Sequence, residues 1–265
     1  MEFSTYPQLF KFDLNDRVLT VTLNNPGQLN AISSIMDDEL PRIFFEADRD
    51  QRIDIIVLTG EGRAFSAGGD LDGMMKNLDG IDNFLAGYRN GKRFMQLMLD
   101  TEKPIIAKVN GDAVGMGCTL ALCADIVVAS ETARFGDPHV RVGLAAGDGG
   151  GVFWPHNAGS ANAKYFLMTG DLISAAEAKE IGLIAKVVPQ DRLDAEVDRI
   201  VGRLKSNSMV SVRFSKSILN IPLRQALASS VDAGFALESI SSQLPDHKEA
   251  VHAFIEKRKP DFSKK

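Results

Sequence analysis

Apolar and polar positions alternate in short blocks along most of the chain, and their spacing predicts where strands and helices lie. Two segments in which apolar and polar residues alternate, 9–14 and 18–23, flank Asn15 and Asp16 and predict a hairpin. Short apolar runs predict further strands at 53–59, 104–109, 125–129 and 134–136.

Helical spacing of apolar residues separates these strands. One helix is predicted from residue 29 onward, where Ser33 and Ser34 are available as caps and Pro41 predicts a kink or a restart. Another is predicted at about 92–99, after a polar stretch at 72–90 that we interpret as a mobile lid or a short helix near a site entrance. Strands that alternate with helices indicate an α/β fold.

Beyond residue 190 only helical patterns remain. They predict helices at 193–204, 208–219 and 223–244. The last of these carries Phe235, Leu237 and Ile240, which together are too apolar for a free surface. We therefore predict two parts: a core at 1–190 and a C-terminal helical oligomerisation segment at 191–265.

Two glycine-rich loops follow buried strands. Residues 110–120, NGDAVGMGCTL, lead from a strand into a helix, and residues 63–71, RAFSAGGDL, follow another apolar run. Glycine lets the backbone NH groups of such a turn come close to a negatively charged oxygen. Tight packing alone would also explain one such loop, but two loops at strand ends could each aim one NH group at the same carbonyl oxygen.

Composition excludes several classes of function. The chain has 265 residues, of which 45% are hydrophobic and 25% charged, so it is long enough to bury a large core. Its net charge of −5 argues against nucleic-acid binding, and no apolar run reaches transmembrane length or forms a signal peptide, which predicts a cytoplasmic protein without a membrane partner. We expect Cys118 and Cys123 to be buried reduced thiols, and the four histidines form no metal-ligand cluster.

These motifs, with LNNPGQLNAIS before them and FIEKRKPDF near the end, resemble the crotonase family of enoyl-CoA hydratases and isomerases. The resemblance covers nearly the whole chain. It implies a spiral of repeated β-β-α units with a C-terminal helical segment, assembled as trimers or hexamers. It also implies an acyl-CoA substrate, with coenzyme A as part of that substrate and no separate cofactor. The backbone NH groups of Gly69 and Met116 would form the oxyanion hole.

The resemblance also implies which residues bind the CoA ester. They are Arg63, Ala64, Ala67, Gly68, Asp70, Leu71 and Lys257. Lys257 belongs to a basic cluster, 257–259, that suits the phosphate charges of CoA, although a solvated helix end would explain the same charges. Asn25 stands where relatives commonly carry arginine or lysine, so one phosphate contact is expected to be missing.

The catalytic positions depart from the family pattern. Hydratases of the family use two glutamates, and these positions hold Thr119 and His139 here. A threonine hydroxyl is not basic near neutral pH, so we interpret Thr119 as a packing residue or a water anchor. His139 has the ordinary pKa of a neutral-pH base, and Asp148 would orient it, although an aspartate before three glycines is also a good helix cap.

The segment from Asp137 to Gly170 is similar to 6-oxocamphor hydrolase, a family member that cleaves a carbon–carbon bond of a cyclic β-diketone. This similarity covers His139 and Asp148, and the later segment ALES, residues 236–239, adds Glu238 as a site residue. A histidine of that enzyme's second glycine loop corresponds to Met116 here, which is a departure from its pattern.

Three hypotheses follow. The first is hydration or isomerisation of an enoyl-CoA through an enolate held by Gly69 and Met116, with His139 and Asp148 replacing the glutamate pair. The second is hydrolytic carbon–carbon cleavage, of the retro-Claisen type, of a β-dicarbonyl compound. The third is a non-catalytic acyl-CoA-binding subunit. Thr119 favours the last two, whereas His139 and Asp148 argue against the third.

Overall fold

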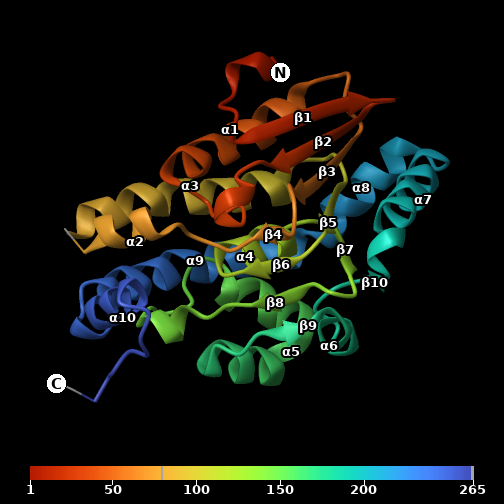
Figure 1. Ribbon diagram of the computed structural model, residues 1–265. Coiled ribbons are helices and arrows are strands. Elements are labelled where there is room, and N and C mark those ends of the chain that lie inside the picture. Colours follow the sequence, from red (N-terminus) through yellow and green to blue (C-terminus); the bar gives the residue numbers. More distant parts are fainter. Residues whose placement is uncertain (79, 264–265) are drawn as a thin grey trace.

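The computed structural model, which describes residues 1–78 and 80–263, contains two sheets covered by helices (Figure 1). The larger sheet has the order β1-β2-β3-β5-β7-β10 and is parallel except for the β1–β2 pair. Its strands are β1 (Phe10–Asn15), β2 (Val18–Leu23), β3 (Ile55–Gly60), β5 (Ile105–Val109), β7 (Ile126–Ser130) and β10 (Lys186–Val188). The smaller sheet, in the order β4-β6-β8-β9, contains β4 (Ala64–Ser66), β6 (Asp112–Val114), β8 (Arg134–Gly136) and β9 (Ile173–Ser174).

The α-helices are α1 (Ser34–Arg49), α2 (Leu71–Asn77), α3 (Ile81–Asp100), α4 (Met116–Leu122), α5 (Gly150–Thr169), α6 (Ala175–Glu180), α7 (Leu193–Lys205), α8 (Met209–Leu219), α9 (Ile221–Ser242) and α10 (Pro245–Ile255). The 3-10 helices are η1 (Phe3–Thr5), η2 (Pro26–Gln28), η3 (His139–Val142) and η4 (Gln190–Arg192). From β3 to α5 each unit places one strand in each sheet before the chain turns into helix, which confirms the expected repetition of β-β-α units. None of the helices in the described part of the chain combines the length and apolar character that crossing a bilayer requires.

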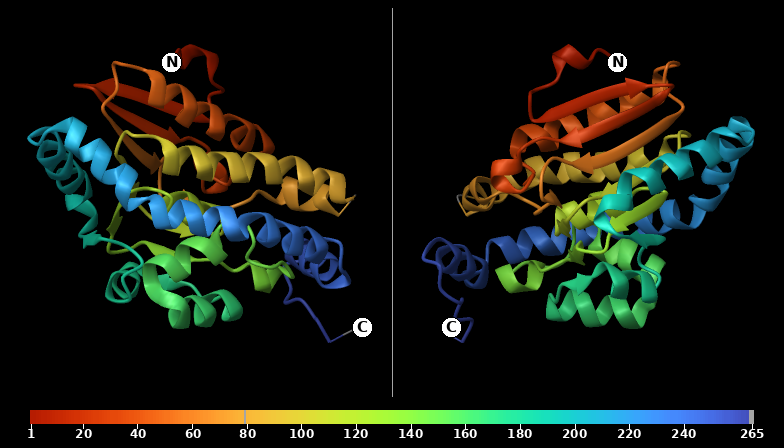
Figure 2. Two further views of the ribbon diagram at one scale, coloured as in Figure 1. Left: turned by 180° about the vertical axis from the view of Figure 1, so that it is seen from behind. Right: turned by 45° about the vertical axis from the view of Figure 1, so that its right-hand side comes forward.

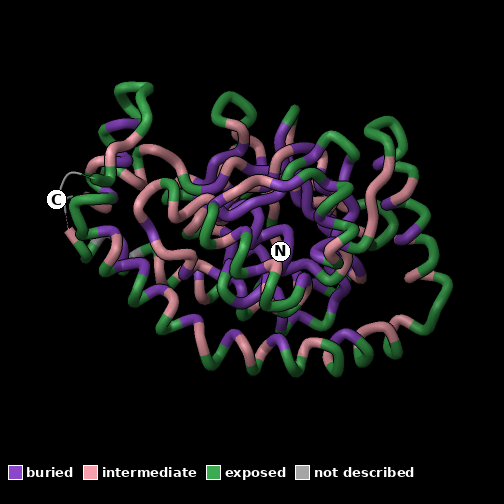
Figure 3. The backbone as a smooth tube through the Cα atoms, turned by 90° about the horizontal axis from the view of Figure 1, so that it is seen from below, coloured by how far each residue is buried: buried purple, intermediate pink, exposed green. Residues whose placement is uncertain are grey.

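Local sequence explains most of the strands. The predicted hairpin forms, and its turn residues Asp16 and Arg17 have φ of 45° and 65°, the left-handed pair that a tight two-residue turn uses. The apolar runs become β3, β5 and β7, which are almost completely buried. Figure 3 shows buried residues gathered in the middle of the molecule.

The predicted restart at Pro41 is wrong, because α1 continues through it as one helix. Ser33 caps this helix by accepting a hydrogen bond from the Met36 backbone NH. Met36, Leu40 and the proline itself are all buried on one face. Burial of this apolar face therefore offsets the hydrogen bond that proline removes.

The helix predicted at 92–99 is longer than expected. The stretch 72–90 contains most of α2 and the first half of α3, with residue 79 outside the described residues, so the prediction of a short helix holds only for α2. The extension of α3 depends on α9, which lies between α3 and α5 (Figure 2). Tyr88 packs edge-on against Phe235, and Lys92 pairs with Asp232 at 2.5 Å. The contact that orders this stretch thus comes from a distant part of the sequence.

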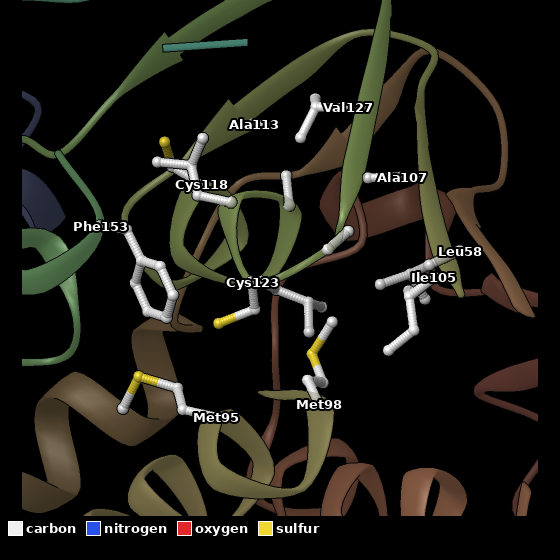
Figure 4. Close-up of a cluster of buried hydrophobic side chains, with 14 of the residues drawn as sticks. Leu58, Met95, Met98, Ile105, Ala107, Ala113, Cys118, Cys123, Val127 and Phe153 are labelled. Atoms are coloured by element: carbon white, nitrogen blue, oxygen red, sulfur yellow. The ribbon is translucent and has the colours of Figure 1, made fainter. Parts of the chain in front are cut away.

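The C-terminal part is helical as predicted, but its apolar residues do not all face outward. Phe235 is 6% exposed and belongs to the core of its own chain, so it is not available to a partner. Leu237 and Ile240 are exposed to 61% and 56%. Figure 4 shows Cys118 and Cys123 in the central apolar cluster, and both are free and buried, as predicted.

Candidate active site

A cavity of about 450 Å³ lies between α1, α3, the two glycine loops, η3 and α9. It contains most of the site residues that the sequence indicated: Ala67, Gly68, Gly69, Asp70, Met116, His139, Asp148 and Glu238. Arg63, Ala64, Leu71 and Lys257 are not among its lining residues. Ala64 is buried in β4, where its carbonyl oxygen accepts a hydrogen bond from Asn30, so a direct contact between this residue and a ligand is not supported.

The two glycine loops lie against each other in the cavity wall. Gly68 has φ of 94°, and a Cβ at this position would lie 2.8 Å from the Val114 carbonyl oxygen. Gly115 has φ of 53°. Only glycine combines this backbone conformation with such close approach at Gly68.

Each loop presents a backbone NH group at the cavity. Among the described residues, none accepts a hydrogen bond from the NH of Gly69. Met116 is the first residue of α4, so its NH has no partner within the helix. Both residues line the cavity, and together they could bind one carbonyl oxygen.

The imidazole of His139 is held from behind by Asp137. Nδ1 of His139 is in close contact with Oδ1 of Asp137, which is 2% exposed. The sequence indicated Asp148 for this orienting role and gave no role to Asp137. The motif DPH places the two residues two positions apart, but that spacing alone does not show which way the aspartate turns.

Two further carboxyl groups face the other ring nitrogen. Nε2 of His139 lies 3.5 Å from Oδ2 of Asp148 and 3.6 Å from Oε1 of Glu238. Oδ1 of Asp148 and Oε2 of Glu238 are buried and have no hydrogen-bond partner among the described residues. The ring therefore has one carboxyl group on its Nδ1 side and two on the side of Nε2.

Glu238 reaches this position because α9 comes unusually close to the loop before α5. A Cβ on Gly147 would lie 2.2 Å from the Gly234 carbonyl oxygen and 2.9 Å from Cβ of Glu238. The backbone NH of Ala145 also donates to the Ser241 hydroxyl at 3.0 Å. Two glycines and one hydrogen bond thus join α9 to the site.

The carboxyl groups determine where protons reside. Burial alone would lower the pKa of His139, but the three neighbouring carboxyl groups outweigh it and raise that pKa well above 6.5. Burial raises the pKa of Asp148 to about 6, against the opposing effect of His139, and raises that of Glu238 well above its usual 4.5. His139 and Glu238 therefore keep their protons to higher pH than the isolated groups would, and Asp148 is mainly ionised near neutral pH.

Thr119 lies apart from this chemistry. It is 2% exposed and does not line the cavity. Its Cγ2 atom would be 2.5 Å from a Cβ on Gly149, so it packs directly under the loop that carries Asp148. This supports the packing role that the sequence indicated.

The C-terminal basic cluster is partly neutralised. Arg258 forms ion pairs with Glu249 and Glu256. Lys257 follows α10 and is exposed, with φ of 54°. A smaller groove of about 360 Å³ between α2 and α10 is lined by Lys76, which also lines the main cavity. Lys76 thus borders both hollows.

The residues around His139 do not form a convincing metal site. Ligand atoms of Asp137, His139 and Asp148 lie within 4.8 Å of one another. However, Asp137 contacts Nδ1 whereas Asp148 faces Nε2, and the lone pairs of these two nitrogens diverge. The arrangement is better suited to proton transfer.

Comparisons with known proteins show the family to which this chain belongs. Residues 13–265 match the family model described as enoyl-CoA hydratase/isomerase. The chain is 36% identical over 246 residues to a probable enoyl-CoA hydratase of Rhizobium meliloti (strain 1021), covering 93% of this chain and 94% of that protein. A solved enoyl-CoA hydratase/isomerase from Mycobacterium paratuberculosis is 34% identical with a TM-score of 0.89, covering 94% of this chain and 99% of the other.

A second solved structure has a different activity in its name. It is a β-diketone hydrolase from the cyanobacterium Anabaena sp. PCC 7120, bound to (S)-3-oxocyclohexyl acetic acid. It is 28% identical to this chain with a TM-score of 0.83, and the match covers 91% of this chain and 96% of that structure.

Proposed function

Because the chain belongs to the enoyl-CoA hydratase/isomerase family, we propose that it is an enzyme that moves protons to and from an acyl-CoA thioester. The thioester oxygen would bind between the NH groups of Gly69 and Met116, which would stabilise the enolate as negative charge develops there. Hydration or isomerisation of an enoyl-CoA is the proposed reaction.

One observation carries this proposal. Two carboxyl groups, those of Asp148 and Glu238, lie on the same side of His139 and in the same cavity as the NH groups of Gly69 and Met116. Two carboxyl groups whose surroundings give them different proton affinities are suited to act as base and acid. The glutamate pair that is missing at Thr119 and His139 is thus replaced from two other positions.

The proposed steps need one base and one proton donor. In hydration, Asp148 removes a proton from water as the oxygen adds to the β-carbon, and the electrons of the double bond move to the thioester oxygen as an enolate. Glu238 or His139 then donates a proton to the α-carbon. His139, which sequence analysis considered a base, is here a charged proton donor fixed by Asp137. In isomerisation, Asp148 would remove a proton from one carbon and Glu238 or His139 would donate its own proton to another, after which a proton passes from Asp148 to that donor and restores the starting state.

Coenzyme A binding can be tested directly. If Arg63, Lys257 and the groove along α10 hold the CoA part, a non-reactive acyl-CoA at about 100 times its Kd should stabilise the folded chain by about 2.7 kcal/mol. The melting temperature of a chain of this size should then rise by roughly 5–11 °C in thermal denaturation. The melting temperature with pantetheine thioester alone serves as the control. An unchanged melting temperature at millimolar acyl-CoA would remove the CoA part of the proposal.

Carbon–carbon hydrolysis is the second candidate, favoured by the likeness to the β-diketone hydrolase and by the absence of the usual glutamates. Asp148 would activate water for attack on one carbonyl, and the bond to the α-carbon would break to give an enolate that the same acid protonates. Turnover of enoyl-CoA esters and of cyclic β-diketones by the purified protein separates these two reactions.

A trimer or hexamer remains part of the proposal, supported by the exposed side chains of Leu237 and Ile240.

A further inference from the structure

The wall of the cavity formed by α1 and α3 contains a carboxyl group that the proposed chemistry does not use. Asp37, on α1, lines the cavity, and its Oδ1 atom is buried without a hydrogen-bond partner among the described residues. Asn90 on α3 donates to the neighbouring Asp38 at 2.6 Å and also hydrogen-bonds to the Asp37 carboxyl group, but Oδ1 of Asp37 is left without a partner. One oxygen of Asp37 is thus an unused acceptor in the cavity wall.

The cavity that Asp37 lines also has small and apolar residues in its wall. Gly87 on α3 leaves space beside the carboxyl group, since a Cβ there would lie 3.7 Å from Oδ2 of Asp37. Phe84, Phe94 and Phe235 line the same cavity and are each buried. An acceptor without a partner in such surroundings destabilises the empty protein, which a ligand with a matching donor would relieve.

A role in helix stabilisation does not account for this carboxyl group. An acidic residue in the first turn of a helix stabilises it in its ionised form, which would lower its pKa. Burial instead raises the pKa of Asp37 to about 7. A carboxyl group that is half protonated near neutral pH is a poor partner for a cation. Asp37 is also a poor partner for an anionic group, because the exposed Asp38 lies next to it in the sequence. A neutral hydroxyl group, which can donate or accept, suits it best.

We propose that Asp37 is a specificity residue that binds a hydroxyl group on the acyl part of the substrate, so that the preferred acyl group carries a hydroxyl beyond the reacting carbons. This inference rests on the proposed function, because it assumes that the carbonyl group binds at Gly69 and Met116. It adds the substrate class: a hydroxylated acyl chain or ring in place of a simple hydrocarbon.

The test compares two acyl-CoA esters of equal length, one ending in a hydroxyl group and one in a methyl group. Wild-type protein should bind the hydroxylated ester about tenfold more tightly and, if it turns both over, favour it to a similar degree in kcat/KM. Asp37→Leu should remove this preference while it keeps affinity for the methyl ester. Asp37→Asn, which has nearly the same shape, should lower the ratio and provides a second variant in case the leucine variant does not fold.

The binding ratio keeps this inference separate from the proposed function. Equal affinities in the wild type, or an unchanged ratio in both variants, would overturn the role of Asp37. If the preference in binding is found but neither ester is turned over, the proposed reaction fails and the specificity site stands.

Discussion

Replacing Asp148 by asparagine, or His139 by alanine, is expected to lower kcat by about 100-fold or more. The asparagine amide cannot accept a proton at position 148. Alanine at position 139 removes the imidazole, which is the charged proton donor that the three carboxyl groups surround. Because the two residues act in one cluster, separated by 3.5 Å, the double variant should lose little more than either single variant. Steady-state kinetics on the best substrate of the panel would measure these losses.

Thr119→Ala is the matched control, since Thr119 is buried behind the same loop but outside the cavity. It should keep kcat within about twofold, because a threonine hydroxyl does not transfer protons near neutral pH. A large loss of kcat in this variant, or full turnover by His139→Ala, would show that the catalytic groups have been assigned wrongly.

Gly111→Ala is expected to destabilise the protein by about 2–3 kcal/mol. An alanine Cβ at this position would lie 2.0 Å from the carbonyl oxygen of Arg63 and 3.0 Å from Cα of Ala64. Both neighbours are backbone atoms, so they cannot rotate away, and the two glycine loops would have to separate. Thermal denaturation at a fixed protein concentration should show a melting temperature lower by roughly 4–12 °C.

Gly202→Ala provides the comparison, because Gly202 lies within α7 and a Cβ there would meet nothing within 4 Å. This substitution should stabilise the protein by about 0.5–1 kcal/mol, since alanine favours the helix. Equal melting temperatures for the two alanine variants would mean that the close approach of the loops does not contribute to stability as the structure indicates.

The sequence predicts those parts of the fold whose cause is local. Buried strands such as β3 and β5 appear as apolar runs, and the turn between β1 and β2 follows from its residues. The first half of α3 was not predicted, because its order depends on Phe235, which lies far away along the chain. The continuity of α1 through Pro41 also depends on tertiary packing, which no local rule contains.

The site shows the same division. The glycine loops and His139 were identified from the sequence because their residue types suggest backbone donors and a titrating ring. Asp137 was missed, since its role depends on a side-chain rotation. The raised pKa of His139 could not be foreseen either, because burial alone would lower it and the largest opposing effect comes from Asp137, whose orientation the sequence does not show.

The pH dependence of kcat/KM tests most directly the claim that Asp148 is the base while Glu238 and His139 hold protons. Asp148 must be ionised to accept a proton, so activity should fall tenfold per pH unit below its pKa of about 6 and be level above it, until the raised pKa of the acid is reached. Asp148→Asn should lose the acidic limb along with most of its activity. An acidic limb that persists unchanged in Asp148→Asn, or wild-type activity that is independent of pH from about 5 to 8, would contradict the account.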